Sequence, residues 1–289
     1  MTGWLVVNCF MDSKNFTEIY SLLLKAAKER EINLILKKTD ELVCDVSGGI
    51  KGIALPDFAI FWDKDIYLAE ILESAGIRLF NSAASVRLCD NKALTALRLA
   101  QFGLPAPKTV IAPKTFEGTG FNNMSFLNTS AKTIGFPMVI KEIYGSFGQQ
   151  VYLADNAQQA EEIIKSLGFK EFIMQEYISE NKGQDIRINV IGGRVTSAIL
   201  RFNNNDFRSN ITNGGNSIPY SPNKEQCKIA LDVCKAFGLD FAGVDILLGK
   251  NETPVVCEVN SNPHFKGTLK STGDNLAEDI LDYISECFR

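Results

Sequence analysis

Histidine is nearly absent from this chain of 289 residues, which has only His264, and the seven cysteines form no Cys-x-x-Cys pair. Zinc sites need clustered cysteine and histidine ligands, so a zinc protein is not expected. A Ser-His-Asp triad built on His264 remains open, although no Gly-x-Ser-x-Gly turn accompanies it. Odd, dispersed cysteines are typical of reduced and mostly buried thiols, which predicts a cytoplasmic protein.

Long apolar runs and clusters of positive charge are also missing. No segment approaches the roughly 20 apolar residues of a membrane span, and the formal net charge is −4 without a Lys/Arg tract. These absences argue against membrane association and against nucleic-acid binding. The first residues pass directly into a strand without a basic segment, so no signal peptide is expected. The oligomeric state is left open, with a homo-oligomer as one alternative.

The order of the expected elements divides the chain into three parts. Residues 1–87 alternate strand and helix patterns, which predicts an α/β domain with a parallel, helix-covered sheet. Ligands of such sheets gather beyond the carboxyl ends of the strands. Asp63 and Lys64 follow an apolar strand at such an end, where they contact a substrate or cap the next helix. The expected strands are 4–8, 32–36, 58–62 and 77–80, and the expected helices are 16–30 and 65–75.

The second part, residues 88–174, has the size of a small lid domain. It begins with a helix that Asp90 is expected to cap, and it contains a loop at 113–129 that is rich in Gly, Asn and Thr. Residues 175–289 change to hairpins, which predicts an antiparallel sheet and an overall α/β (α+β) class. Further strands are expected at 108–112, 136–141, 151–153, 171–175, 241–249 and 253–261, two more within 185–201, and helices at 90–101, 156–167, 224–237 and 275–287.

The last expected hairpin carries acidic side chains on one face. Its apolar residues set the register by pairing Val244 with Val259 and Leu248 with Val255. This register places Asp245 opposite Glu258, with Asn260 on the same face, and like charges directly opposite each other destabilise a sheet. A divalent cation removes the conflict, because carboxylate and carboxamide oxygens suit magnesium shared with phosphates. The alternative is an acidic strand face in solvent.

A glycine loop follows the strand that ends at Lys141. Gly145, Ser146 and Gly148 let backbone N–H groups approach phosphate oxygens, and Lys141 supplies positive charge nearby. The loop is not a Gly-x-x-x-x-Gly-Lys P-loop, so a plain β-turn is the alternative.

Two other polar segments are candidate ligand contacts. Arg208 and Asn210 offer donors that suit a phosphate or a carboxylate, and a solvated loop is the alternative. Glu176 and Tyr177 lie in an extended hinge, whose backbone suits an adenine ring and whose carboxylate suits a ribose hydroxyl. Polar residues at strand ends are common, so the hinge carries little weight by itself.

The order of these segments resembles the ATP-grasp superfamily, and most closely its RimK-like glutamate ligases. The resemblance covers about residues 88–285. It implies an ATP-grasp fold with an N-terminal parallel α/β domain, a central lid subdomain and a C-terminal antiparallel-sheet subdomain. The matching patterns are Gly-x-Asp-Ile-Arg at 183–187, Phe-Arg-Ser-Asn at 207–210, Ala-Gly-Val-Asp-Ile-Leu at 242–247 and Glu-Val-Asn at 258–260.

The resemblance also implies roles for individual side chains. Asp185 would meet the ribose of ATP, and Arg208 and Asn210 would hold the transferring phosphoryl group. Two magnesium ions are implied, with manganese as an alternative. The implied ATP-binding residues are Lys92, Lys141, Ser146, Glu176, Tyr177, Asp185, Arg208 and Asn210, and the implied metal ligands are Asp245, Glu258 and Asn260.

The implied activity is that of an ATP-dependent carboxylate–amine ligase that forms an amide through an acyl phosphate. Such an enzyme would add an amino acid, for example glutamate, to a small molecule or a peptide. One rival is a nonenzymatic ATP-binding regulatory protein on the same fold. Another is a ligase that modifies a protein or a ribosomal peptide. The acid, the amine and the number of additions are left open.

Two departures from the family pattern concern the lid and the substrate. Gln150 stands where the family usually has another glycine, so the lid loop differs in detail. After Asn260 the chain reads Ser-Asn-Pro-His-Phe-Lys-Gly in place of Ala-Ser-Pro-Gly. His264 is therefore expected near the active centre, where it deprotonates an amine or orients the loop and the substrate. This departure puts the identity of the substrate in doubt.

Overall fold

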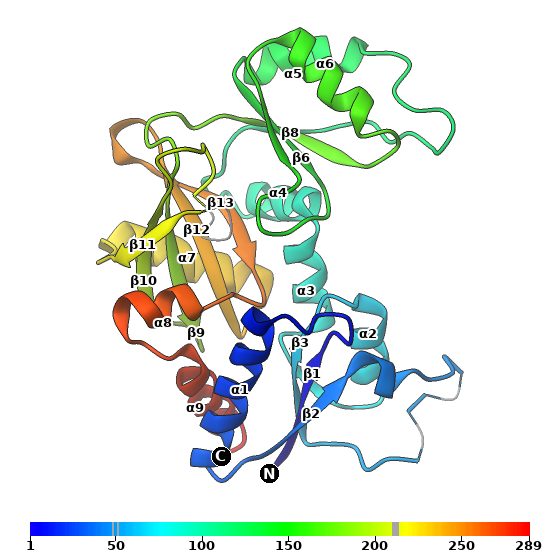
Figure 1. The fold of residues 1–289 in the computed structure, drawn as a ribbon, viewed down its shortest axis with the longest axis vertical. Helices are drawn as coiled ribbons and strands as arrows, with labels where there is room; N and C mark the ends of the chain where they lie inside the picture. Colours follow the sequence, from blue (N-terminus) through cyan, green and yellow to red (C-terminus); the bar gives the residue numbers. More distant parts are fainter. Residues whose placement is uncertain (48, 51, 210–213) are drawn as a thin grey trace.

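The structure is a computed structural model that describes residues 1–47, 49–50, 52–209 and 214–289. Three sheets define three parts of the chain, and Figure 1 shows the central part at the top and the N-terminal part at the lower right. The combination of one parallel and two antiparallel sheets confirms the predicted α/β (α+β) class. No helix in the described ranges is long and apolar enough to cross a membrane.

The N-terminal part is a parallel sheet with helices on both faces, as its alternating pattern predicts. Its elements are β1 (Thr2–Val7), α1 (Lys14–Glu29), β2 (Asn33–Lys38), the 3₁₀ turn η1 (Thr39–Leu42), β3 (Phe58–Trp62), α2 (Ile66–Ser74) and β4 (Arg78–Phe80). The strand order is β2-β1-β3-β4. Alternate residues of β1 enter two apolar cores, with Leu5 beside α1 and Val6 beside α2. Strands β1 and β3 are therefore buried on both faces, as strands of parallel sheets usually are, whereas the edge strand β2 is largely exposed.

Two consecutive helices, α3 (Ala83–Asp90) and α4 (Lys92–Gln101), connect this part to the next. The boundary expected at residue 87 falls within α3. The prediction that Asp90 caps the second helix is wrong, because Asn91 accepts a hydrogen bond from the Leu94 N–H at 3.0 Å. Asp90 instead ends α3 and pairs with Lys64 at 2.6 Å. A carboxamide caps a helix about as well as a carboxylate does.

The central part is an antiparallel sheet with two helices against one face. Its elements are β5 (Thr109–Ile111), α5 (Ser125–Ile134), β6 (Met138–Glu142), β7 (Val151–Ala154), α6 (Ala157–Ser166) and β8 (Phe172–Glu176), and the strand order is β5-β8-β6-β7. The prediction of a loop at 113–129 is wrong for its last residues, because α5 begins at Ser125. Leu127 of α5 is buried in the apolar cluster of this part, and tertiary packing outweighs the local composition.

The C-terminal part is an antiparallel sheet, as the hairpin pattern predicts. Its elements are β9 (Gln184–Ile191), β10 (Arg194–Phe202), β11 (Asn216–Pro219), α7 (Lys224–Phe237), β12 (Phe241–Leu248), the 3₁₀ turn η3 (Lys250–Glu252), β13 (Pro254–Asn260), α8 (Lys266–Thr272) and α9 (Leu276–Cys287). The strand order is β11-β10-β9-β12-β13. Helix α9 packs beside α1 of the N-terminal part in one apolar core, so the end of the chain joins two parts (Figure 1).

The hairpin of β12 and β13 has the predicted register at the acidic pair. The confirmed pairs are Val244 with Val259 and Asp245 with Glu258. The predicted pairing of Leu248 with Val255 is wrong, because a β-bulge after Asp245 shifts the register by one residue. Cys257 is the extra residue of the bulge, and it lines the same cleft as Glu258.

Candidate active site

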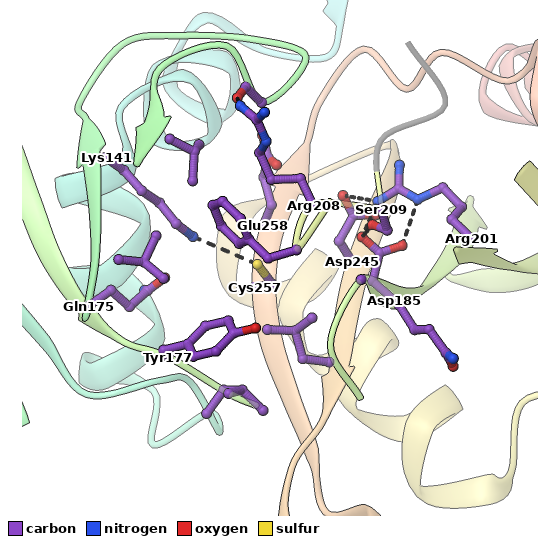
Figure 2. Close-up of a pocket in the computed structure, with 18 of the residues that line it drawn as sticks. Lys141, Gln175, Tyr177, Asp185, Arg201, Arg208, Ser209, Asp245, Cys257 and Glu258 are labelled. Atoms are coloured by element: carbon purple, nitrogen blue, oxygen red, sulfur yellow. Dashed lines mark hydrogen bonds and ion pairs between the residues drawn. The ribbon is translucent and has the colours of Figure 1, made fainter. Parts of the chain in front are cut away.

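A cleft between the central and C-terminal sheets, here called the upper cleft, collects most of the predicted site residues (Figure 2). Asn260 lines a second, adjoining cleft toward the N-terminal part, here called the lower cleft. Asn210 lies outside the described residues. The predicted residues that line the upper cleft are Lys92, Lys141, Ser146, Glu176, Tyr177, Asp185, Arg208, Asp245 and Glu258.

One end of the upper cleft is largely apolar. Tyr177 follows β8 and meets Phe207 edge to face with 6.2 Å between ring centroids, and Leu247 lines the same cleft. Glu176 is fixed against the neighbouring chain, because its Oε2 accepts from the N–H of Lys108 at 3.1 Å. The Glu176 N–H donates to the backbone oxygen of Lys108 at 2.8 Å. An apolar slot beside an extended backbone suits a purine base, which needs both stacking area and hydrogen bonds.

The glycine loop at the other end of the upper cleft is held by cationic side chains. Lys92 donates to the backbone oxygen of Gly145 at 3.0 Å, and Arg208 donates to that of Gly148 at 2.7 Å. Burial lowers the pKa of Lys92, although the nearby Glu258 carboxylate opposes the shift. Arg208 also donates from Nε and Nη2 to the Asp206 carboxylate. Lys92 Nζ and Arg208 Nη1 meet neutral carbonyl oxygens, for which a phosphate would be a stronger, charged replacement.

The loop itself is closed by the glutamine that departs from the family pattern. Gln150 Oε1 accepts from the Ser146 N–H at 3.3 Å, while the Ser146 hydroxyl accepts from Lys64 at 3.0 Å. A Cβ on Gly145 would lie 2.5 Å from Gln150 Oε1, so the present position of the Gln150 side chain requires glycine at 145. Phe147 has a φ of +59°, a left-handed conformation that aims its ring toward the lower cleft. The hydrogen bond from Ser146 to the Gln150 side chain thus closes the glycine loop at the position where the family usually has a glycine.

Lys141 is a buried cation without an ionic partner. Its side chain lies in β6, 9% of the residue is exposed, and it forms no ion pair among the described residues. Its Nζ contacts the Sγ of Cys257 at 3.7 Å (Figure 2). Burial raises the pKa of the Cys257 thiol, and Lys141 opposes the shift only in part. A buried positive charge is unfavourable without a counter-ion, so this position favours an anionic ligand in the upper cleft.

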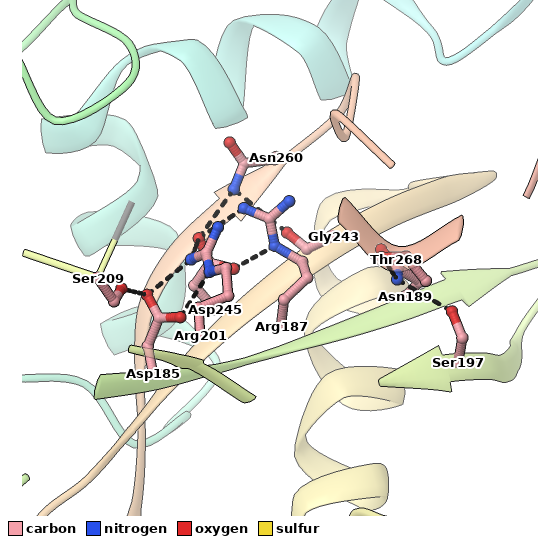
Figure 3. A network of polar contacts seen from close by, with 10 residues as sticks. All are labelled: Asp185, Arg187, Asn189, Ser197, Arg201, Ser209, Gly243, Asp245, Asn260 and Thr268. Atoms are coloured by element: carbon pink, nitrogen blue, oxygen red, sulfur yellow. Dashed lines mark hydrogen bonds and ion pairs between the residues drawn. The ribbon is translucent and has the colours of Figure 1, made fainter. Parts of the chain in front are cut away.

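Asp245 is buried, and two arginines balance its charge (Figure 3). Arg187 donates from Nη2 to Asp245 Oδ2 at 2.8 Å, and Arg201 Nη2 lies 2.8 Å from the same oxygen. Burial alone would raise the pKa of the Asp245 carboxyl, but the two guanidinium groups hold it below its usual value. The charge conflict with Glu258 is therefore relieved by arginine, and the conflict by itself no longer requires a metal.

Asp185 takes part in the same network. It accepts from Nε and Nη2 of Arg201, both at 2.6 Å, and from the hydroxyl of Ser209. Asp185 lines the upper cleft, but its carboxylate is engaged by these partners. Its contact with a ribose therefore stays a prediction.

Oxygen ligands for magnesium remain available beside this network. Glu258 has no hydrogen bond or ion pair among the described residues. Asn260 directs its Nδ2 to Asp245 Oδ2 at 3.3 Å and to the Gly243 oxygen at 3.4 Å, which leaves its Oδ1 for a ligand. Glu258 and Asn260 therefore fit a magnesium ion. Asp245 is engaged by Arg187 and Arg201, so its role as a third metal ligand stays a prediction.

The lower cleft contains the histidine that the sequence placed near the active centre. His264 meets the rings of Phe16 and Phe147 edge to face, with centroids 5.7 and 6.4 Å away. Burial lowers the pKa of His264, and the nearby Lys266 lowers it further. The three aromatic rings come from the N-terminal part, the glycine loop and the loop after β13. His264 thus lies where all three parts of the chain meet.

The sequence analysis missed several residues of the two clefts. Arg187 belongs to the Gly-x-Asp-Ile-Arg pattern, which was the available signal, but it received no role. Arg201 ends a hairpin strand, and nothing in its local sequence distinguishes it from a solvated arginine. Neither Asp63 nor Lys64 caps α2, because Asp65 does so by accepting from the Leu68 N–H at 3.0 Å.

Comparison with known proteins agrees with this geometry. A family model described as a RimK-like ATP-grasp domain matches residues 89–284. A probable alpha-L-glutamate ligase of Legionella pneumophila is 34% identical over 74% of this chain and 69% of its own length. An uncharacterized protein of Mycoplasma pneumoniae, the MG012 homolog, is 33% identical over 78% of this chain and 79% of its own.

A solved structure shows the same fold over nearly the whole chain. It is a RimK domain ATP-grasp protein from Sphaerobacter thermophilus, with a TM-score of 0.75, 20% identity and coverage of 98% of each chain. The likeness confirms the predicted fold. It includes the N-terminal part, which lies outside the residues that carry the family motifs. The chain belongs to the RimK-like ATP-grasp family of ligases.

Proposed function

We propose that this protein is an ATP-dependent ligase that joins a carboxylic acid to an amine. The buried cation Lys141 carries the proposal, because it has no ionic partner and faces a cleft with an apolar slot at one end. ATP supplies both matching parts, a purine base for the slot and phosphates for the cation. In the reaction the substrate carboxylate attacks the γ-phosphoryl group, which releases ADP and gives an acyl phosphate. The amine then attacks the acyl carbon, and phosphate leaves as the amide forms.

The side chains of the upper cleft divide between binding and transfer. Tyr177 and Glu176 frame the base, and Lys92 and Lys141 bind phosphates. Arg208 exchanges its contact with Gly148 for the transferring phosphoryl group, whose charge its planar guanidinium stabilises. The same proposal includes a contact of Asn210 with the transferring phosphoryl group and a contact of Asp185 with the ribose.

Bound magnesium would supply positive charge against the phosphates during the transfer. Glu258 and Asn260 supply the free oxygens for it, and Asp245 is the third proposed ligand. We expect two ions, with manganese able to replace magnesium, because both cations accept hard oxygen ligands. The cytoplasmic location that the dispersed thiols predict is part of this proposal; all seven cysteines are unpaired.

Glutamate is the first amino acid to test as a substrate, because a similar protein carries the name of an alpha-L-glutamate ligase. The acceptor is a small molecule or a peptide. A matrix of carboxylic acids and amino acids, incubated with Mg-ATP, is assayed for ADP and for new masses. Product at the mass of the condensed pair confirms the proposal, with Glu258→Gln as the inactive control. Tight Mg-ATP binding without ADP release for any pair would instead support a nonenzymatic ATP-binding protein.

A further inference from the structure

The lower cleft lies between the carboxyl ends of two N-terminal strands and the loop that follows β13. It adjoins the upper cleft, because Ser146 and Glu258 line both. Asn8 follows β1 and Asp63 follows β3, and these strands are neighbours in the parallel sheet. Ligands bind at this edge in parallel sheets. The lower cleft is therefore placed to present a second substrate to the phosphate end of the upper cleft.

Two buried oxygen atoms in the lower cleft have no hydrogen-bond partner. They are Oδ2 of Asp63 and Oδ1 of Asn262. Asp63 is only 6% exposed. The Asn8 side chain also acts on its carboxylate as a hydrogen-bond donor, but Oδ2 has no donor at full hydrogen-bond geometry, which is unfavourable for a buried acceptor. The remaining atoms of both groups are engaged, because Asp63 Oδ1 accepts from the N–H groups of Lys64 and Asp65 at 2.6 and 2.7 Å. Asn262 Nδ2 donates to the backbone oxygen of Asp63 at 2.9 Å.

These contacts fix the positions of both unpaired oxygens. The backbone donors at the start of α2 hold the Asp63 carboxylate, and the Asn262 carboxamide is tied to the same residue. Two fixed acceptors on residues that line the same cleft suit a ligand with several N–H or O–H donors. One of the two is on a carboxylate, so a cationic donor is favoured over a neutral one.

We propose that Asp63 and Asn262 bind the amino group of the amine substrate, and that this substrate is an amino acid. The inference rests on the proposed ligase function, in which one substrate must carry an amino group. An ammonium group has three donors and no acceptor, which matches the two unpaired acceptors. The site makes no use of His264, whose ring contacts Phe16 and Phe147.

The lysines of the lower cleft favour a ligand that also carries a carboxylate. Lys270 lines the cleft, is exposed, and forms no ion pair with any described residue. Lys266 also lines it but is paired with Glu18 and bonded to Asn15 at 3.1 Å. Lys270 is thus a cation of the lower cleft that is available to a carboxylate. An amino acid brings both charged groups in one small molecule.

The test measures binding, so it does not depend on turnover. Calorimetry with Mg²⁺ and a nonhydrolysable ATP analogue compares each of the twenty amino acids with its des-amino counterpart, for example L-glutamate with glutarate. At least one amino acid is expected to bind about ten- to a hundredfold more tightly than its counterpart, the range of a charge-assisted hydrogen bond. Equal affinity within every pair, or no binding by any amino acid, overturns the proposal.

Two variants and a matched control locate the amino-group site. Asp63→Asn removes the charge at nearly constant shape, and Asn262→Ala removes the second acceptor. Both should reduce the preference for the amino acid at least fivefold, with unchanged affinity for the ATP analogue. Asp65→Asn neutralises a carboxylate two residues away and keeps a good helix cap, so the preference should stay within twofold. Two folded variants that keep the full preference overturn the assignment.

The result separates this inference from the proposed function. If an amino acid is preferred through Asp63 but no ADP forms with any acid, the ligase function fails and the amino-group site stands. If ADP and an amide form while des-amino compounds bind equally well, the function stands and the site assignment fails. In that case water satisfies the two oxygens, and the amine binds elsewhere.

Discussion

The Nη2 of Arg201 lies 2.8 Å from Oδ2 of Asp245, in the middle of a buried network. The same guanidinium also holds Asp185, so one arginine bridges two carboxylates that were expected to contact metal and ribose. Burial lowers the pKa of Arg201, but the two carboxylates outweigh burial and raise it, so the group stays charged. The contacts that stabilise the C-terminal sheet therefore also occupy the carboxylates that are proposed to bind metal and ribose.

Asp245→Asn is expected to destabilise the protein. The substitution leaves the buried Arg187 without its carboxylate, while Arg201 keeps Asp185. Breaking a buried ion pair in this way costs about 3–5 kcal/mol. The measurement is the free energy of unfolding from a urea titration monitored by fluorescence. Asp232→Asn, which removes an exposed helical pair with Lys228, is the control, with an expected change below about 0.5 kcal/mol. Equal stability of the two variants would contradict the role of the network.

Glu258→Gln is expected to separate activity from stability. Glu258 has no hydrogen bond or ion pair among the described residues, so the unfolding free energy should change by less than about 0.5 kcal/mol. ADP release should fall by about a hundredfold or more, because the proposed magnesium loses a charged ligand. Glu252→Gln, in the turn of the same hairpin, serves as the control. Normal turnover by Glu258→Gln at matched magnesium would remove Glu258 from the metal site.

His264 should titrate below the usual histidine range. Burial and the neighbouring Lys266 lower its pKa from the model-peptide value of 6.5. The folded state therefore binds fewer protons than the unfolded state just below pH 6.5, and stability is lost as the pH falls through this window. Because the chain has one histidine, the imidazole C2 proton gives the pKa directly by NMR. A midpoint at or above 6.5 would show that the ring is solvated or paired with an acid.

Cys257 should report occupation of the upper cleft. Cys257 is half-buried and its thiol lies beside Lys141. Desolvation raises the pKa of the thiol, so little reactive thiolate is present. Iodoacetamide should modify it more slowly than the exposed Cys287, and Mg-ATP should slow it at least fivefold further. Peptide mass mapping follows both sites in one sample, with Cys287 as the internal control. Loss of labelling at Cys287 alone would place the nucleotide elsewhere.

Arg208→Lys should impair phosphoryl transfer more than nucleotide binding. Lysine keeps the positive charge but loses the planar fork that contacts Gly148 and Asp206 together. A fall of about ten- to a hundredfold in kcat, with a KM for ATP within about threefold, is the expected pattern. Arg194→Lys, at an exposed pair with Glu286, should leave both constants unchanged. A rise in KM without a fall in kcat would limit Arg208 to ground-state binding.

Local patterns were sufficient for most elements of the fold. Helix α7 begins and ends where its pattern predicts, at Lys224 and Phe237, because capping by Asn223 and the glycine at 238 are local signals. Helix α8 and strand β11 were not predicted. Both are short and are stabilised by contacts with each other, such as the hydrogen bond between the hydroxyls of Ser217 and Ser271 at 2.8 Å. Such contacts between distant segments leave no periodic signal in the sequence.

In the acidic hairpin, too, the sequence predicted the local pairing but not the contacts with distant segments. Alternation of apolar residues was enough to place Asp245 opposite Glu258, since side chains on a strand alternate between faces. The bulge that turns Cys257 into the cleft was not foreseen, because an extra residue disrupts that alternation. The arginines that balance Asp245 come from β9, which pairs with β12, and from β10, which lies on the far side of β9; only the sheet order reveals this.

The sequence by itself determined the family, the order of the three parts and most residues of the upper cleft, because these depend on short motifs and on local periodicity. Only the tertiary structure decided how charges are matched and where the second substrate is expected. Asp63 and Asn262 are 199 residues apart in sequence, and their unpaired oxygens become a site only when the N-terminal part and the loop after β13 are folded together.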